Sequence, residues 1–547
     1  LSPLSCYNKG KINEREETEM LKLVLGTSGS GKTTLLYARI RARAEAGKRS
    51  ILLVPEQFTS STEARIYREL GDALSGMVES YSFTSLAEHI LAVEGGAAVQ
   101  TLTDAGRAVL VRRALEELQD NVHYYYRHRR SAAFCQMAAE TIDELKSAGL
   151  SGQQLQELAR DCGTESAKLG ELALIFQGYE SLLAGTGMDP ADRLELAADR
   201  LEAALARDEL PEFLRDRAVF IDEFDTFNAP KKRLMGAMLA ALPTVTVALC
   251  DDGSPMVPGD MGLFSGAKQV AAQLRQLARK NGAQVAAPEL LRRDLRHKDA
   301  PGLAALTELL ETGSCTPPES APELRLFAAA SREEEARCAA AAIRRLMRQG
   351  VRCGKIAVVC RDISLYRAAV RYEFRMAEIP LYCDEPTTPE FSAPATAVRA
   401  LLALLRGADM TEQLTVLAKT GLCALSEEQV CALENYAYTW SPNAAAWRAE
   451  FTKNPKGFGE NELTDEDRQN LAWAEDARRK LVDAVDTLRG KVKGGNAEQI
   501  SRAVYFCLKE LGAEEQQAGL VEDIRAARGI PAAEEAAREW NVVMQLL

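Results

Sequence analysis

The sequence feature that most constrains this chain is the stretch LKLVLGTSGSGKTTLLYARI at residues 21–40. Its apolar beginning predicts a buried strand, and the pattern after residue 33 predicts a helix. Between them, GTSGSGKT has the glycines, lysine and hydroxyl residue of a P-loop, in which successive backbone N–H groups surround a phosphate. Since a P-loop lies between a strand and a helix, we expect an α/β domain with a parallel sheet.

The side chains of this loop predict how a nucleotide would be held. Lys32 is expected to reach the β- and γ-phosphates and Thr33 to bind Mg²⁺, so ATP and Mg²⁺ are the expected cofactors. The alternative is a glycine- and serine-rich turn that binds nothing. The predicted nucleotide-binding residues are Gly26, Thr27, Ser28, Gly29, Ser30, Gly31, Lys32, Thr33 and Thr34.

Composition limits the class of protein. No apolar run is long enough to span a membrane and the first residues carry no signal-peptide pattern, so we expect a cytoplasmic protein that does not bind membranes. The net charge of −12 argues against non-specific coating of DNA but allows a local basic channel. The 12 cysteines are scattered without a CxxC pair, so no zinc or iron–sulfur site is expected within this chain. Thiols such as Cys250 and Cys360 are expected to be reduced and buried.

The chain divides into stretches with alternating strand and helix patterns and stretches with helical periodicity alone. Met20 directly precedes the first strand and is expected to start the natural chain, and the apolar last residues suggest a truncated end. The expected parts are an upstream extension (1–19), a first α/β core in two pieces (20–100 and 207–320) with a helical insertion between them (101–206), a second α/β core (321–410) and a second helical insertion (411–547).

Two carboxylates follow an apolar strand pattern in RAVFIDEFDTF at residues 217–227. In P-loop ATPases an aspartate at this place holds Mg²⁺, which is the role we expect for Asp222. The adjacent Glu223 is a candidate base for the attacking water. The alternative is that these acids simply follow a strand, as acids often do.

The second α/β core is expected to contain strands at LRLFAA (324–329) and KIAVVCRD (355–362). Arg361 would then emerge at the carboxyl edge of a parallel strand, where such sheets present their ligand-binding residues. If the two cores face each other across the nucleotide, Arg361 is a candidate catalytic contact to the γ-phosphate. The alternative is a surface ion pair with Asp362.

The order of these parts is similar to that of superfamily 1 helicases of the UvrD/RecB type and resembles most the AddB family of helicase–nuclease subunits. The resemblance covers nearly everything from residue 20 onward. It is carried by LGTSGSGKT, LLVPEQFT, VESYSFTSLAEHIL, IDELKSAGLS, VFIDEFDTF, VCRDISLYRAAVRYEFRMAEIPLYCDE and LENYAYTW. The fold that it implies is two RecA-like P-loop cores with parallel sheets, each with an all-helical insertion.

The resemblance also implies a function and partners. AddB subunits pair with an AddA helicase–nuclease subunit, process broken double-stranded DNA ends for recombinational repair, and scan single-stranded DNA. Their iron–sulfur cluster belongs to a C-terminal nuclease that this chain does not include. The chain lacks the expected glutamine before the P-loop, the tyrosine expected before Arg361 and the glutamine after FIDEF. Two hypotheses therefore stay open: an ATP-hydrolysing subunit, and a scaffold that binds ATP and single-stranded DNA without hydrolysis. A small-molecule P-loop enzyme would not explain the second core.

The DNA contacts implied by the resemblance lie in VPEQFT and SYSFTS. Hydroxyl and amide side chains there are candidates for phosphate contacts, and the two phenylalanines are candidates to stack on bases. The alternative is that both rings are core residues. The run HYYYRHRR (123–130) interleaves aromatic and basic residues, and either follows a DNA backbone or is a solvated helix end. The predicted DNA-binding residues are Gln57, Phe58, Thr59, Ser82, Phe83 and Thr84.

Overall fold

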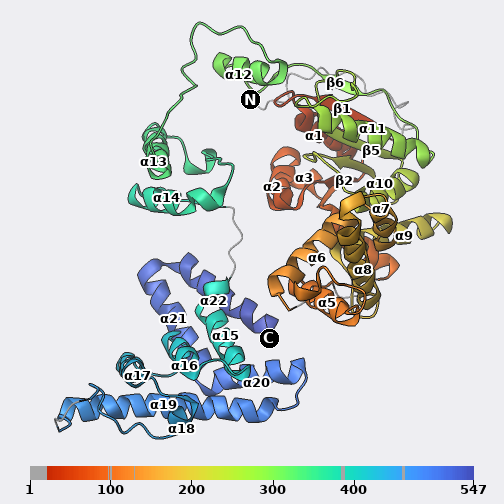
Figure 1. Cartoon of the computed structure of the whole chain (residues 1–547). Coiled ribbons are helices and arrows are strands. Elements are labelled where there is room, and N and C mark those ends of the chain that lie inside the picture. Colours follow the sequence, from red (N-terminus) through yellow and green to blue (C-terminus); the bar gives the residue numbers. More distant parts are fainter. Residues whose placement is uncertain (1–20, 97, 99–100, 129, 384–388, 459–461) are drawn as a thin grey trace. The chain divides into compact units, whose positions relative to one another are not determined.

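The computed structural model describes residues 21–96, 98, 101–128, 130–383, 389–458 and 462–547. The chain forms two compact units, one ending at Phe327 and the other running from Ala328 to Leu547. In Figure 1 the first unit, which contains the sheet, is coloured red to green, and the helices of the second unit are coloured teal to blue. The expected start at Met20 and the expected extension at 1–19 lie outside the described residues.

The first unit is built on a six-stranded, all-parallel sheet with the strand order β3-β2-β4-β5-β1-β6. This confirms the predicted α/β class. The strands are β1 (Leu21–Gly26), β2 (Ser50–Leu53), β3 (Val78–Tyr81), β4 (Ala218–Ile221), β5 (Thr244–Cys250) and β6 (Glu289–Leu291).

Successive side chains of a strand point to opposite faces of a sheet. Here apolar side chains lie on both faces, and helices cover both. Leu23 and Leu25 belong to a buried cluster with helices α4, α9, α10 and α11. Val24, between them, belongs to another buried cluster with α1 and α2. These helices are α1 (Lys32–Glu45), α2 (Thr59–Leu70), α4 (Phe83–Glu94), α9 (Pro190–Ala206), α10 (Ala229–Ala241) and α11 (Ser265–Lys280).

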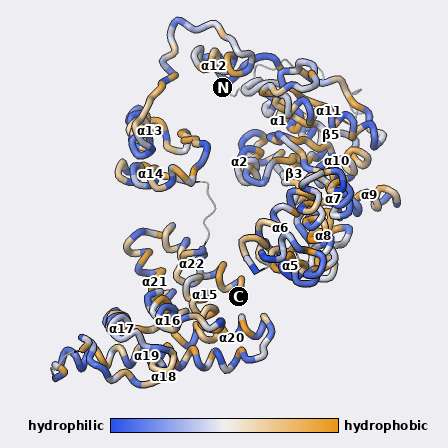
Figure 2. Tube along the Cα trace, viewed as in Figure 1, coloured by the Kyte–Doolittle hydropathy of each residue, from blue (hydrophilic) through white to orange (hydrophobic). Residues whose placement is uncertain are grey.

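A helical segment with its own buried core separates β3 from β4. Its apolar residues pack around Val111 and Phe176, both fully buried. It contains α5 (Asp104–Glu117), α6 (Ala132–Ser147), α7 (Gly152–Ala159) and α8 (Ser166–Leu183); the short α3 (Asp72–Ser75) precedes β3 and α12 (Pro301–Thr312) follows β6. Figure 2 shows that these helices mix hydrophobic and hydrophilic residues, as expected of helices with one face in a core.

The second unit is helical. A small cluster joins its first two helices through Ile343 and Phe374, and a larger core around Trp447 joins the others. The helices are α13 (Arg332–Arg348), α14 (Ile363–Met376), α15 (Ala393–Leu405), α16 (Met410–Lys419), α17 (Glu427–Trp440), α18 (Ala444–Arg448), α19 (Asp465–Val492), α20 (Ala497–Glu510), α21 (Ala513–Arg528) and α22 (Ile530–Leu546). None of the helices in the described ranges has the length and apolarity needed to cross a membrane.

The strands expected in the second α/β core are not present. Neither 324–329 nor 355–362 forms a strand, and the described residues of the second unit contain no sheet. A strand forms only where a neighbour satisfies its backbone N–H and C=O groups, so an apolar pattern without a pairing partner does not produce a strand. The side chains of Leu326 and Val359 are exposed as a result.

Candidate functional site

The P-loop lies at the carboxyl edge of the sheet, where the end of β1 at Gly26 is in register with Cys250 of β5. Gly29 and Gly31 have φ angles of 80° and 92°, a left-handed conformation that glycine adopts at little cost. Gly31 caps α1 without any side-chain hydrogen bond to the first turn. The first N–H groups of this 14-residue helix are thus not capped by a side chain, which suits an anion.

The side chain of Lys32 is hydrogen-bonded to its own loop. Its Nζ donates hydrogen bonds to the carbonyl oxygens of Gly26 at 2.7 Å and Thr27 at 2.8 Å. Burial lowers the pKa of Lys32, and Cys250 and Asp222 oppose that shift. The ammonium group is therefore held at the phosphate-binding loop by two neutral acceptors that a phosphate could replace.

Asp222 directly follows β4 and is only 6% exposed. Its carboxylate accepts a hydrogen bond from the backbone N–H of Glu223 at 3.0 Å. Burial raises the pKa of Asp222, while the Thr33 hydroxyl and the Glu223 N–H favour its ionised form. The two residues predicted to hold Mg²⁺ thus line one cavity, although Thr33 lies in α1 and Asp222 directly follows β4.

Glu223 is one of the non-glycine residues with a positive φ angle, 64°. Such a conformation is uncommon outside glycine, and it often occurs at functional sites. Partial burial raises the pKa of Glu223, the carboxylate of Asp222 adds to this, and Arg65 opposes it. A carboxyl with a raised pKa beside a phosphate-binding loop is suited to accept a proton.

The cavity around the P-loop has a volume of about 590 Å³, and three of its lining residues were missed by the sequence analysis: Arg65, Arg296 and Lys298. Arg65 comes from α2, and its guanidinium lies 4.8 Å from the centre of the Tyr37 ring. The other two come from the segment after β6. No motif marks any of the three, because each reaches the cavity only through the fold.

The segment after β6 covers the P-loop. The backbone N–H of Leu295 donates to the Gly29 carbonyl at 3.0 Å, and Nη1 of Arg296 donates to the Ser28 hydroxyl at 3.3 Å. A Cβ atom on Gly29 would lie 2.8 Å from the Asp294 carboxylate, so glycine is required for this close approach.

The residues present fit a magnesium nucleotide. The Oγ atom of Ser30 is buried in the loop without a hydrogen-bond partner among the described residues, so it is available as a donor to a phosphate. Thr33 and Asp222 supply the hard oxygen atoms that Mg²⁺ prefers. Thr34 also lines the cavity.

The predicted DNA contact at Phe83 is not accessible in this structure. The ring is 2% exposed and makes edge contacts with Phe224 at 5.2 Å and Phe227 at 5.8 Å. A ring enclosed in this way has no free face for a base, so Phe83 takes the alternative role, that of a core residue. The neighbouring Ser82 is also buried, and caps α4 by accepting a hydrogen bond from the Ser85 N–H at 3.1 Å.

The other predicted DNA contacts lie at or near the surface. Gln57 and Thr84 are exposed, whereas Phe58 and Thr59 are half-buried. Thr59 donates its hydroxyl to the Glu56 carbonyl at 2.9 Å. Phe58 lines a second cavity of about 400 Å³ that also contains Asp222 and Glu223.

Arg361 is not at the carboxyl edge of a strand. It lies in the second unit, in an exposed segment before α14, while the P-loop cavity is lined by residues of the first unit. Its neighbour Asp362 caps α14 by accepting a hydrogen bond from the Ser364 N–H at 2.9 Å. The predicted contact of Arg361 with a γ-phosphate stays a prediction.

The burial expected for Cys250 is wrong. Its thiol is exposed and lines the P-loop cavity, because Cys250 is the last residue of β5, where the strand leaves the buried sheet. Burial still raises the pKa of this thiol, and Lys32 opposes that shift.

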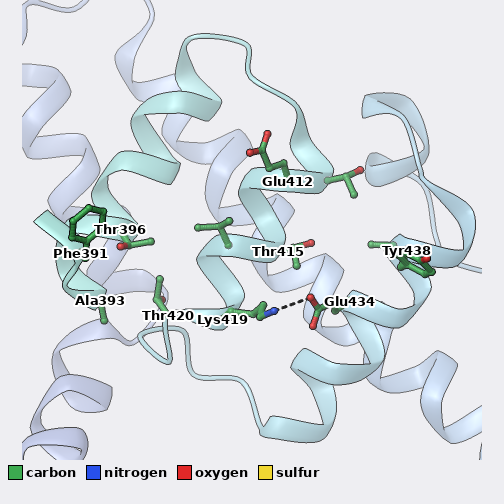
Figure 3. Close-up of a pocket in the computed structure, with 12 residues that line it drawn as sticks. Phe391, Ala393, Thr396, Glu412, Thr415, Lys419, Thr420, Glu434 and Tyr438 are labelled. Carbon is green, nitrogen blue, oxygen red and sulfur yellow. Dashed lines mark hydrogen bonds and ion pairs between the residues drawn. The ribbon is translucent and has the colours of Figure 1, made fainter. Parts of the chain in front are cut away.

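The second unit has a hollow of its own, of about 650 Å³, between the start of α15 and helices α16 and α17. Figure 3 shows its lining, in which the ion pair of Lys419 and Glu434, 2.8 Å apart, joins α16 to α17. Phe391 and Tyr438 border it. With Glu412 as a second carboxylate, its lining carries one positive and two negative charges, so it does not suit a phosphate.

Residues 23–307 match the protein family described as ADDB, N-terminal. The chain is 30% identical over 553 residues to the B subunit of the ATP-dependent helicase/deoxyribonuclease of Moorella thermoacetica, covering 96% of this chain and 47% of that protein. The protein of the same name from Desulforudis audaxviator is 30% identical, with the same coverage. The one from Clostridium perfringens strain 13 is 26% identical over 87% of this chain and 42% of its own length. The chain thus spans about half the length of these relatives.

Proposed function

Because this chain belongs to the AddB family, we propose that it is the ATP-binding, helicase-like part of a helicase–nuclease subunit that acts on double-stranded DNA ends. In this proposal it works in the cytoplasm with an AddA-type partner subunit and holds single-stranded DNA during recombinational repair. An iron–sulfur cluster has no role in the part proposed here. The expected bounds of the six parts are kept as the proposed domain organisation, with 321–410 as a part whose described residues form no sheet.

One observation carries the proposal: the P-loop residues Lys32 and Thr33 lie with Asp222 at one sheet edge. Lys32 donates hydrogen bonds to the loop's own carbonyl oxygens, and Thr33 and Asp222 line the same cavity as Lys32. A lysine for the phosphates, a hydroxyl ligand and an acid at the end of a neighbouring strand are the set that P-loop ATPases use.

The residues of this chain would divide the work on ATP. Lys32 and the N-terminus of α1 would bind the phosphates, and Thr33 and Asp222 would hold Mg²⁺. ATP supplies a phosphoanhydride bond whose cleavage releases free energy. Glu223 would take the proton of the attacking water, and Arg296 would add positive charge beside Ser28.

A second candidate is a scaffold that binds ATP without hydrolysing it. It is favoured by the segment around Arg361, which forms no strand among its described residues. Arginine contacts to the transferring phosphoryl group account for about 10³–10⁵ in rate in other phosphoryl-transfer enzymes. An ATP site without such a contact would hold its ligand and react slowly.

The test is a titration with a non-hydrolysable ATP analogue and Mg²⁺, followed by steady-state ATPase with and without single-stranded DNA. Lys32→Ala should weaken analogue binding by at least about tenfold, or about 1.4 kcal/mol. Lys280→Ala removes an exposed charge at the end of α11 in the same unit and should leave binding unchanged. Unchanged binding in Lys32→Ala would refute the nucleotide site.

Turnover then separates the two candidates. DNA-stimulated ATPase that Glu223→Gln abolishes, with analogue binding retained, supports the hydrolysing subunit. Analogue binding without turnover in the parent chain and in its complex with an AddA-type subunit supports the scaffold.

A further inference from the structure

In the loop between α5 and α6 of the first unit, three backbone N–H groups donate hydrogen bonds to a single carboxylate. Glu171 of α8 accepts hydrogen bonds from the backbone N–H groups of His123 and Tyr124 at 2.8 Å, and of Tyr125 at 3.1 Å. Three successive N–H groups converging on one anion curl the backbone into a nest. Because these N–H groups are already bonded to Glu171 of α8, the conformation of the loop is set before any ligand binds.

Aromatic contacts also hold the same loop in place. Tyr125 stacks on Phe134 of α6, with ring centres 5.4 Å apart and planes at 27°. Tyr124 meets Tyr125 edge-on at 4.9 Å, and its own side chain is 50% exposed. The ammonium group of Lys168 lies 5.5 Å from the centre of the Tyr124 ring. The loop therefore holds one aromatic ring at the surface beside a positive charge.

Two arginines complete the loop. Arg127 and Arg130 are exposed, and neither takes part in any ion pair found among the described residues, whereas Arg112 and Arg113 of the adjacent α5 bond Glu116 and Glu117 at 3.1 and 3.0 Å. Guanidinium groups without a carboxylate partner keep all their donors for an external anion.

We propose that this tyrosine–arginine loop, residues 122–128 and 130, binds the phosphodiester backbone of DNA. Arg127 and Arg130 contact phosphates, and Tyr124 packs against a sugar or base. Arginine interleaved with exposed aromatics is the chemistry of sequence-tolerant nucleic-acid contacts. The inference rests on the proposed function, to which it adds a DNA contact far along the sequence from VPEQFT and SYSFTS.

The direct test compares two double variants that remove the same charge from the same helical segment. Arg127→Ala/Arg130→Ala should weaken binding of the chain to a fluorescent blunt hairpin duplex or to single-stranded oligothymidine, measured by anisotropy at several salt concentrations. Loss of two phosphate contacts should reduce the slope of log K against log salt by about 1.8 on duplex or about 1.4 on a single strand. Arg112→Ala/Arg113→Ala, whose guanidinium groups are already paired, should change neither affinity nor slope appreciably.

A third variant distinguishes the effect of the loop's conformation on DNA binding from the effect of its net charge. Glu171→Gln removes one negative charge from beneath the loop, so a purely electrostatic effect would tighten DNA binding. If the nest holds the arginines in place, the same change should weaken binding about threefold or more, because an amide presents only one acceptor to three N–H groups. A circular dichroism melt of Glu171→Gln that matches that of the parent shows that the helical segment is still folded. If Glu171→Gln does not fold, Arg127→Ala/Arg130→Ala, which alters surface side chains alone, still tests DNA binding by the loop.

The outcomes are distinguishable from failure of the proposed function. A loss confined to the duplex or to the single strand supports the inference and identifies which form is bound. Equal losses in the two arginine pairs, or none in either, overturn it while leaving ATP-analogue binding intact. Loss of binding to polyglutamate with DNA binding unchanged would assign the loop to an acidic protein partner and also overturn it. If the parent chain binds neither DNA, the proposed DNA-holding function fails together with this inference.

Discussion

Replacing Phe83 with alanine should destabilise the first unit and leave DNA binding by the folded chain unchanged. The ring is 2% exposed and packs edge-on against two phenylalanines at 5.2 and 5.8 Å. Truncating a buried phenylalanine costs about 3–5 kcal/mol, because it combines lost transfer free energy with a cavity. For a domain of this class each kcal/mol corresponds to about 2–4 °C, so the melting temperature should fall by roughly 6–20 °C.

The assay pairs a thermal melt followed by circular dichroism with a single-strand DNA titration, done at a temperature where both proteins are folded. Phe391→Ala is the matched control, because it removes the same side chain at a position that is 84% exposed. It should leave the melting temperature within about 1 °C, since surface changes are usually within about 0.5 kcal/mol.

The opposite pattern would refute this reasoning. An unchanged melting temperature together with a loss of about 1–3 kcal/mol in single-strand affinity, the usual contribution of base stacking, would mean that the ring leaves the core to meet DNA. The buried cluster would then be only one of its two positions.

Three other changes test the P-loop site. Burial raises the pKa of Asp222, and an acid whose pKa is higher in the folded state is destabilising above that pKa. Asp222→Asn should therefore raise the melting temperature at pH 7 and lose this advantage in a melt series as the pH falls toward about 4. A constant advantage would contradict the assignment. Gly29→Ala should weaken ATP-analogue binding and lower the melting temperature, because a Cβ at this position, with φ 80°, lies within 3 Å of the covering segment; wild-type values for both would show that the segment moves freely. Cys250 is exposed at the cavity, so Mg·ATP should slow its alkylation, measured by peptide mass spectrometry, while Cys162, exposed elsewhere, reacts at an unchanged rate.

The local parts of the fold and site could be predicted from the sequence because the residues concerned are contiguous. The alternation of Leu23, Val24 and Leu25 between the two faces of the sheet follows from strand periodicity. The P-loop needs its glycines at fixed spacing, and Asp222 follows an apolar strand pattern. Each of these signals lies within a dozen residues of sequence, so a pattern is enough to detect it.

The remaining features depend on contacts between distant residues. The hydrogen bond of Arg296 to Ser28 joins positions 268 apart, and nothing around either residue indicates the other. The sequence left open whether Phe83 is a core residue or a DNA contact, because only the packing of Phe224 and Phe227 decides it. The apolar pattern around Val359 predicts a strand, but no pattern can supply the neighbouring strand that pairing requires.

The unpaired apolar segments of the second unit and of the residues just before it have a practical consequence for anyone who purifies this chain. Leu326 is fully exposed and Val359 is 91% exposed, each within an apolar stretch that forms no strand among the described residues. Such stretches are templates for pairing between molecules. Concentration, more than temperature, should therefore limit how long the chain stays monodisperse in storage, and chaperones that recognise extended apolar peptides should co-purify with it.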